Sequence, residues 1–243
     1  MNLSNPCLPA ALISLASAAA APLASAGSSF TAELVDFNNT GVDGVVTAIL
    51  DDASERLYLE GRISGLTPDV AHLAHIHGRV DDGSAVDSRV PSLLDDVDGD
   101  GFVELAEGAP LYGPILLPVI DENGDAFTAD SSGVLSFRQT FDLTEAGTFA
   151  EGFGLDQLLP LELREFVVHG AIVPPAVGAG TAGEVDGSGG FLPTLPVGAG
   201  AFESAGAADF PGDGNSAAVP TPSAALGGLA LLGLAATRRG LKR

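Results

Sequence analysis

The stretch Ala71–Arg79 reads Ala-His-Leu-Ala-His-Ile-His-Gly-Arg and holds three of the four histidines of the chain. His75 and His77 form a His-x-His pair, and the residues around them have the pattern of a strand. In a strand, side chains two positions apart point to the same face, with Cα atoms roughly 7 Å apart. Two imidazoles at that spacing can bind one metal ion at about 2.0–2.1 Å. The stretch therefore predicts a metal site carried on a β-strand.

The fourth histidine lies far along the chain, in the segment Arg164–Gly170, which also reads as a strand. If the two strands are neighbours, His169 joins His75 and His77 as a ligand of copper or zinc, and the site ties together two halves of the fold. His72 has the opposite parity to His75 and joins only through a bulge. The alternative is that each histidine is half-buried and hydrogen-bonded, with no metal.

Short segments of alternating or β-branched residues, separated by turns, predict an all-β fold. The chain has 32 glycines, 16 prolines and no tryptophan, and long amphipathic helical patterns are scarce. The segments predicted as strands are residues 29–37, 44–50, 57–63, 115–120, 133–143, 164–170 and 195–202, with a short helix within 152–161. Pro114 and Pro118 place the segment 115–120 near a sheet edge.

The chain is strongly acidic, with a formal net charge of −22. Four of the ten basic residues lie in the last six positions, so the body carries six arginines against 32 acidic residues. This balance argues against nucleic acid or an anionic bilayer as a partner of the body, because phosphate contacts need basic side chains. The single cysteine, Cys7, lies near the N-terminus, so no disulfide staples the body.

Residues 1–26 have the pattern of a secretory signal peptide. An apolar segment, Leu8–Ala21, precedes Ala24-Ser25-Ala26, which has the A-x-A form of a cleavage site. This pattern predicts export, and the alternative is an alanine-rich leader with no such role.

An acidic segment within the long polar connection 81–113 matches the calcium-loop pattern D-x-D-x-D-G-x5-E at every required position. Residues 96–107 read Asp-Val-Asp-Gly-Asp-Gly-Phe-Val-Glu-Leu-Ala-Glu. The expected calcium ligands are the carboxylates of Asp96, Asp98, Asp100, Glu104 and Glu107 and the main-chain carbonyl of Phe102. The alternative is an acidic turn that binds no ion.

The flanks of this loop differ from those of a paired EF-hand. Pro91 interrupts a helix before the loop, and we expect Gly108 and Pro110 to stop one after it. The pattern therefore predicts a lone calcium loop inserted between strands. Its expected role is structural, because a bound ion would order a connection too polar and too long to order itself.

The histidine stretch also carries a resemblance to a known family. A strand that ends in Ser64-Gly65-Leu66, followed by Ala74-His75-Ile76-His77-Gly78, resembles the core of a CHRD domain. The CHRD domain is similar in layout to copper-zinc superoxide dismutase, an eight-stranded Greek-key β-sandwich. In the dismutase family a His-x-His strand and a distant Val-Val-His strand bind copper, and Val167-Val168-His169 fits the second element. The resemblance implies a β-sandwich over residues 27–204, with His75, His77 and His169 as metal ligands.

The dismutase pattern is incomplete in this chain. That family needs a bridging histidine, further His and Asp ligands for zinc, and a structural disulfide, whereas this chain has four histidines and one cysteine. We therefore expect a non-catalytic, metal-binding surface or matrix module. One alternative is a superoxide dismutase-like metalloenzyme using the same histidines, with Arg79 or Arg138 attracting superoxide. Another is a purely structural surface protein without a transition metal.

The C-terminal part divides into a predicted flexible acidic linker, residues 205–218, and a tail, residues 219–243. The tail has a Val-Pro-Thr-Pro start, about 14 apolar residues, and the basic cluster 238–243. About 14 residues give ~21 Å of helix, which is short for a bilayer core of ~30 Å. This order resembles the PEP-CTERM sorting signal, although that signal has Pro-Glu-Pro; the alternative is a plain tail anchor.

The resemblance to a sorting signal implies partners and a location. The tail would anchor the chain transiently in the inner membrane, where an exosortase-type processing enzyme would act on it. The product would then lie at the cell surface, in the outer envelope or outside the cell. Its partner there would be extracellular matrix or a surface polysaccharide.

Overall fold

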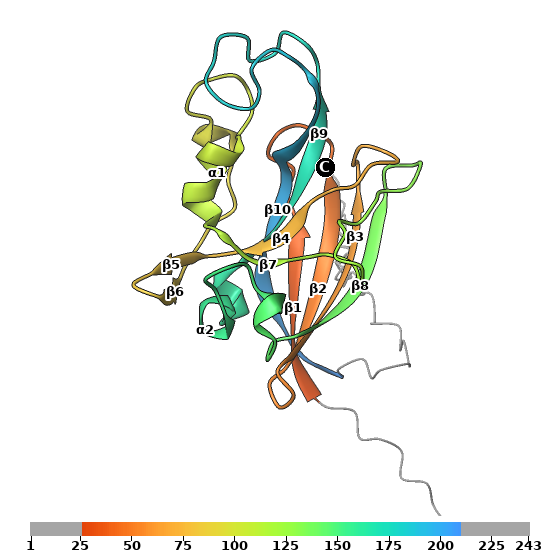
Figure 1. The fold of residues 1–243 in the computed structure, drawn as a ribbon, viewed down its shortest axis with the longest axis vertical. Helices are drawn as coiled ribbons and strands as arrows, with labels where there is room; N and C mark the ends of the chain where they lie inside the picture. Colours follow the sequence, from red (N-terminus) through yellow and green to blue (C-terminus); the bar gives the residue numbers. More distant parts are fainter. Residues whose placement is uncertain (1–25, 210–243) are drawn as a thin grey trace, which may run out of the picture. The chain divides into compact units, whose positions relative to one another are not determined.

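The computed structural model describes residues 26–209 of the chain, and strands dominate that part (Figure 1). The main strands are β1 (Ala26–Leu34), β2 (Asp43–Asp51), β3 (Arg56–Ser64), β4 (Ala74–His77), β7 (Ile115–Pro118), β8 (Leu135–Asp142), β9 (Glu165–Val173) and β10 (Gly190–Asp209). They form one antiparallel sheet in the order β7-β4-β9-β10-β1-β2-β3-β8. The sheet is strongly curled, which confirms the predicted all-β, sandwich-like fold.

Several smaller elements lie outside this sheet. A separate hairpin pairs β5 (Arg79–Asp81) with β6 (Ser84–Val86). The helices are α1 (Leu105–Tyr112) and α2 (Leu155–Leu158), and 3-10 turns occur at Leu93–Asp95, Ala146–Thr148 and Leu161–Leu163. Within the described residues 26–209, no helix is both long enough and apolar enough to cross a membrane.

The curled sheet encloses the main hydrophobic core. Phe137 on β8 and Phe166 on β9 stack with ring centroids 5.9 Å apart, although these strands are not neighbours in the sheet. Alternation along the strands decides which side chains reach this core. On β4 and β9, Ile76, Phe166 and Val168 point inward and are fully buried. The residues between them in sequence therefore face outward, away from the core.

The connection from β4 to β7 covers part of this outer face. A second, smaller apolar cluster forms there from Phe37, Val103, Tyr112, Val167 and Ala199. Val103 lies in the predicted calcium loop and Tyr112 ends α1, and both are fully buried. The outer face beneath α1 is thus a second packed layer.

The prediction that Gly108 and Pro110 would stop a helix after the loop is wrong, because α1 runs through both residues. A Cβ atom at Gly108 would lie 2.5 Å from the Tyr112 ring, so glycine makes room for that side chain. Pro110 costs the helix one main-chain hydrogen bond. We attribute the survival of this eight-residue helix to the packing of Tyr112 in the second apolar cluster.

The last strand is longer than predicted. The sequence predicts a strand at 195–202 and a flexible linker from residue 205, but β10 runs from Gly190 to Asp209. Its last residues pair with the start of β1, with Gly206 opposite Ser29 and Asp209 opposite Ala26. The small residues of this segment are typical of a linker, yet here their main-chain groups pair with those of β1. The rest of the predicted linker, the tail and residues 1–25 of the predicted signal peptide lie outside the described residues.

Asn38 fastens the calcium-loop segment to the sheet. Its Nδ2 donates to the main-chain carbonyls of Val103 (3.0 Å) and Pro196 (2.7 Å). Its Oδ1 accepts from the N–H of Val103 at 2.7 Å. The side chain is only 2% exposed, so water cannot easily replace these bonds.

We predict that Asn38→Ala lowers the free energy of unfolding by about 3 kcal/mol, because it leaves three buried main-chain groups without partners. Denaturant titration of the full chain measures this loss. The matched control is Asn123→Ala in an exposed turn, with an expected change below about 0.5 kcal/mol. Equal effects at the two positions would contradict the anchoring role of Asn38.

Candidate metal centre

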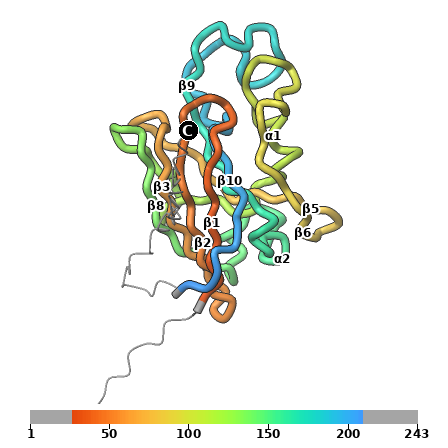
Figure 2. Tube along the Cα trace, turned by 180° about the vertical axis from the view of Figure 1, so that it is seen from behind, coloured from red at the N-terminus to blue at the C-terminus, as the bar shows by residue number. Residues whose placement is uncertain are grey.

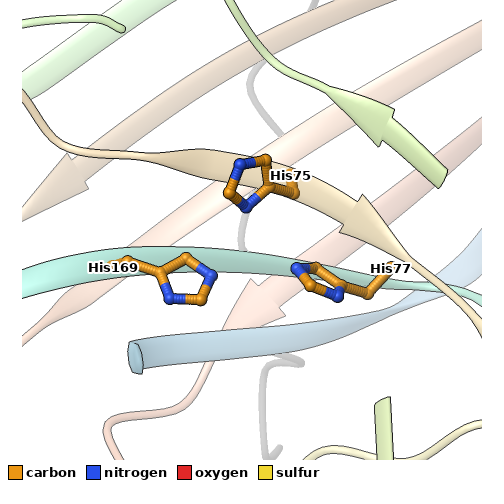
Figure 3. Close-up of side chains that lie close together, drawn as sticks. All are labelled: His75, His77 and His169. Atoms are coloured by element: carbon orange, nitrogen blue, oxygen red, sulfur yellow. The ribbon is translucent and has the colours of Figure 1, made fainter. Parts of the chain in front are cut away.

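The pairing of β4 with β9 brings the three outward-facing histidines together. His75 lies opposite Val167 and His77 opposite Glu165, so His169 follows on the same face. One ring nitrogen from each of His75, His77 and His169 lies within 4.8 Å of the other two. Figure 3 shows the three rings turned toward one another. The sequence prediction of a shared position for these residues thus agrees with the geometry.

β4 and β9 are adjacent strands of the sheet, as the shared histidine site requires. The prediction that this site links two halves of the fold is nevertheless wrong. The cluster lies on the outer face of these strands, and the core lies on their inner face. The reason is parity, because His75 and His77 alternate with the core residues Ala74 and Ile76.

A set of ring nitrogens in the cluster has no hydrogen-bond partner within residues 26–209. These are Nδ1 of His75 and Nε2 of both His77 and His169, and all three atoms are buried. A buried polar atom without a partner is costly, so such atoms are rare in proteins. Three of them in one cluster form a set of nitrogen donors suited to copper or zinc.

Main-chain carbonyls hold the other nitrogens of two of these rings. Nδ1 of His77 lies 2.9 Å from the carbonyl oxygen of Gly113, and Nδ1 of His169 lies 2.7 Å from that of Thr194. A carbonyl oxygen only accepts, so each Nδ1 carries the hydrogen and donates it. In the neutral ring Nε2 then keeps its lone pair, which is the form that binds a metal.

Burial keeps these rings neutral. Removal from water, reinforced by the other histidines, lowers the pKa of His75 and of His77 to about 3. Burial also lowers the pKa of His169 to about 4. At neutral pH, protons therefore do not compete with a metal ion for the free nitrogens.

His72 is separate from this cluster, as its parity predicts. It is fully buried, and its two ring nitrogens lie 2.9 Å from the carbonyl oxygens of His169 and Thr67. The edge of its ring meets Phe191 at a centroid distance of 5.8 Å. His72 therefore supports the strand that carries His169 and offers no nitrogen to the site.

Two further residues border the cluster and were not predicted. The Tyr112 ring meets His77 edge-on at a centroid distance of 4.7 Å. Glu165 is 1% exposed and pairs with His77 in the β4–β9 register, and burial raises its pKa to about 7. Glu165 has the parity of His169, so alternation along β9 could have found it. No sequence signal connects Tyr112 with His77.

The predicted calcium loop places its acidic side chains in two overlapping groups. Asp96, Asp98 and Glu107 form one group, and Asp98, Asp100 and Glu104 form the other. One carboxylate oxygen each of Asp98 and Asp100 is buried without a hydrogen-bond partner. Burial and the neighbouring carboxylates raise the pKa of Asp100 and of Glu104. A cation would satisfy the free oxygens and offset this repulsion.

The remaining predicted ligands of the loop are also placed. Glu107 accepts hydrogen bonds from the N–H groups of Val97 (2.6 Å) and Glu104 (3.0 Å), so it folds back across the loop. Phe102 packs at the margin of the main core, and its N–H donates to Asp100 at 2.8 Å. All five predicted carboxylates thus belong to one of two groups that share Asp98.

The connection between β9 and β10 closes the calcium loop on one side. The N–H of Val185 donates to the carboxylate of Glu104, which is 2% exposed. Gly183 lies directly against this carboxylate, and Gly178 lies against Asp100. Figures 1 and 2 show this connection beside the loop that precedes α1 from two opposite sides. The loop therefore has a partner segment, supplied from far along the chain.

Comparison of the sequence with known protein families and with curated proteins gives no match.

The buried histidines predict a specific loss of stability in acid. The unfolded chain binds a proton at each histidine near pH 6.5, whereas folded His169 resists protonation to about pH 4. Between these values protons favour unfolding, so stability falls as the pH falls. We expect His169→Asn to remove about 2 kcal/mol of this loss between pH 7 and pH 5.

Asparagine retains a side-chain N–H that can donate to Thr194, which makes it the conservative replacement for His169. The measurement is denaturant unfolding of the metal-free full chain at the two pH values. Acidic groups common to both proteins cancel in the difference. Equal pH slopes for the variant and the original chain would contradict the prediction.

Proposed function

We propose that this chain is an exported, metal-binding β-sandwich module that holds one copper or zinc ion between His75, His77 and His169. Two observations carry this proposal: each of the three histidines places a ring nitrogen within 4.8 Å of the other two, and each has a buried ring nitrogen without a hydrogen-bond partner. Two of these rings are held in the metal-binding tautomer by main-chain carbonyls. Neutral imidazoles in a trio are the typical protein ligands of zinc and copper.

In the same proposal, the loop 96–107 binds calcium in a structural role. Its support is the match to the calcium-loop pattern together with the two overlapping carboxylate groups. Oxygen ligands in this number suit calcium better than a transition metal. The ion would hold together two connections, the one before α1 and the one between β9 and β10, which meet at Glu104.

The proposed setting is the cell surface or the space outside the cell. Support comes from the sequence, through the signal-like residues 1–26 and the PEP-CTERM-like tail 219–243. An exosortase-type enzyme would process the tail at the inner membrane, and the module would then contact matrix or surface polysaccharide. The CHRD-like stretch at His75 and His77 supports an assignment to that type of module.

A non-catalytic role is preferred over a dismutase role on electrostatic grounds. Superoxide is an anion, and a net charge of −22 repels it unless a free cation focuses it at the metal. Arg138 forms an ion pair with Glu60 at 2.6 Å. Arg79 donates to the main-chain carbonyl of Asp87. Dismutase activity is kept as the second hypothesis because His75 is only partly buried, whereas His77 and His169 are buried.

We predict that His77→Ala abolishes stoichiometric copper or zinc binding by the full chain, because it removes one of three ligands. The matched control is His72→Gln, which should keep one metal ion per chain. Elemental analysis, with calcium counted separately from copper and zinc, measures both. The copper-loaded chain should not accelerate superoxide dismutation. Metal retained by His77→Ala would overturn the site, and dismutation would favour the second hypothesis.

Replacing Glu107 by Gln should lower calcium affinity by at least about tenfold, because the loop loses the carboxylate that closes the ion's ligand shell. Glu122→Gln, in an exposed turn, carries the same change of charge and should leave calcium affinity unchanged. Calorimetric titration with calcium measures both. The calcium assignment fails if neither the original chain nor Glu122→Gln binds the ion.

A further inference from the structure

We propose that calcium in the loop 96–107 raises the affinity of the histidine cluster for its transition metal. This inference rests on the proposed function, since it requires both sites. The carbonyl that holds His77 belongs to Gly113, which directly follows the helix that leaves the calcium loop. The carbonyl that holds His169 belongs to Thr194 on β10, which is connected to the start of that helix through Glu184. The structure thus offers a physical route from one ion to the ligands of the other.

The first route runs along α1. This helix begins at Leu105, inside the calcium loop, and its first turn contains Glu107. Its other end delivers Tyr112, whose ring contacts His77, and then Gly113, whose carbonyl accepts from Nδ1 of His77. This short helix has one end in the loop and the other at the ring, so a displacement of the loop can reach His77.

The second route runs through Glu184 to His169. One carboxylate oxygen of Glu184 accepts from the N–H of Leu105 at 3.3 Å, at the start of α1. The other accepts from the hydroxyl of Thr194. The carbonyl of this same Thr194 accepts from Nδ1 of His169 at 2.7 Å. The beginning of α1 is therefore connected to His169 by three successive hydrogen bonds.

Asn38 links the calcium loop to β10 beside the second route. It binds both main-chain groups of Val103, within the calcium loop, and the carbonyl of Pro196. Pro196 lies opposite His169 in the β9–β10 register. Val103 also packs with Tyr112 and Val167 in the second apolar cluster. The calcium loop and the outer face of the sheet therefore share one packed layer.

The sign of the coupling follows from charge and order. Five carboxylates in one loop repel each other, and a bound cation removes that repulsion and restricts the loop. Ordering α1 and the connection between β9 and β10 holds the carbonyls of Gly113 and Thr194 at the rings. The histidines then lose less freedom when the transition metal binds, so the second metal binds more tightly.

Zinc titration of the full chain in calcium-free buffer and in saturating calcium tests this inference. We expect calcium to tighten zinc binding at least about fivefold, at the low end of usual coupling between sites. Linkage requires that zinc tighten calcium binding by the same factor. Both affinities are measured by isothermal titration calorimetry with the two metal ions as the only probes.

Thr194→Val interrupts the second route and leaves the ligands of both sites unchanged. It removes the hydroxyl that binds Glu184 but keeps the main-chain carbonyl that accepts from His169. We expect both ions still to bind and the enhancement by calcium to shrink. The matched control is Thr47→Val on β2, a strand that neither route includes. Its enhancement should equal that of the original chain.

The outcomes separate this inference from the proposed function. Zinc and calcium that both bind, with affinities independent of each other, overturn the coupling and leave the two sites intact. An equal enhancement in Thr194→Val and Thr47→Val overturns the route through Glu184. A chain that binds no zinc under either condition overturns the histidine site itself, and a chain that binds no calcium overturns the calcium loop.

Discussion

β4 and β9 pair so that Ala74 lies opposite Val168 and His77 lies opposite Glu165. This register places the histidines on the outer face and Ile76, Phe166 and Val168 in the core. A slip of one residue in either strand would exchange the two faces, burying an imidazole in the core and exposing a large apolar side chain. Burial of the core residues therefore also holds the ring nitrogens of the site in place.

The fold supplies the ligands, whereas a long connection supplies their support. The β4–β7 connection contains the acidic loop, α1, Tyr112 and the carbonyl of Gly113. Tyr112 contributes to packing and borders the site, since its ring is fully buried against His77. A sheet face that would otherwise meet water becomes an enclosed layer in which three imidazoles remain neutral. The insertion is thus part of the proposed site.

Residue alternation predicts much of this arrangement. It predicts the strands, the shared face of His75 and His77, the matching face of His169 and the opposite direction of His72. The hydrogen-bond acceptors at Gly113 and Thr194 leave no such signal, because a main-chain carbonyl is present at every position. Gly108 and Pro110 wrongly predict the end of a helix, because tertiary packing of Tyr112 outweighs local helix propensity. Residues 205–209 mislead for a similar reason, because pairing with β1 orders a composition typical of linkers.

β10 pairs with β9 over its first part and with β1 over its second, so one strand joins the two parts of the curled sheet. It is also the last strand of the described chain, and its partner β1 is the first. The pairing of β10 with β1 therefore cannot form until nearly all of that chain is available. A contact between residues so far apart in sequence slows folding. Shorter N-terminal fragments would expose the edge of β1 and the side of β9 that β10 covers, and such unpaired edges bind other strands readily.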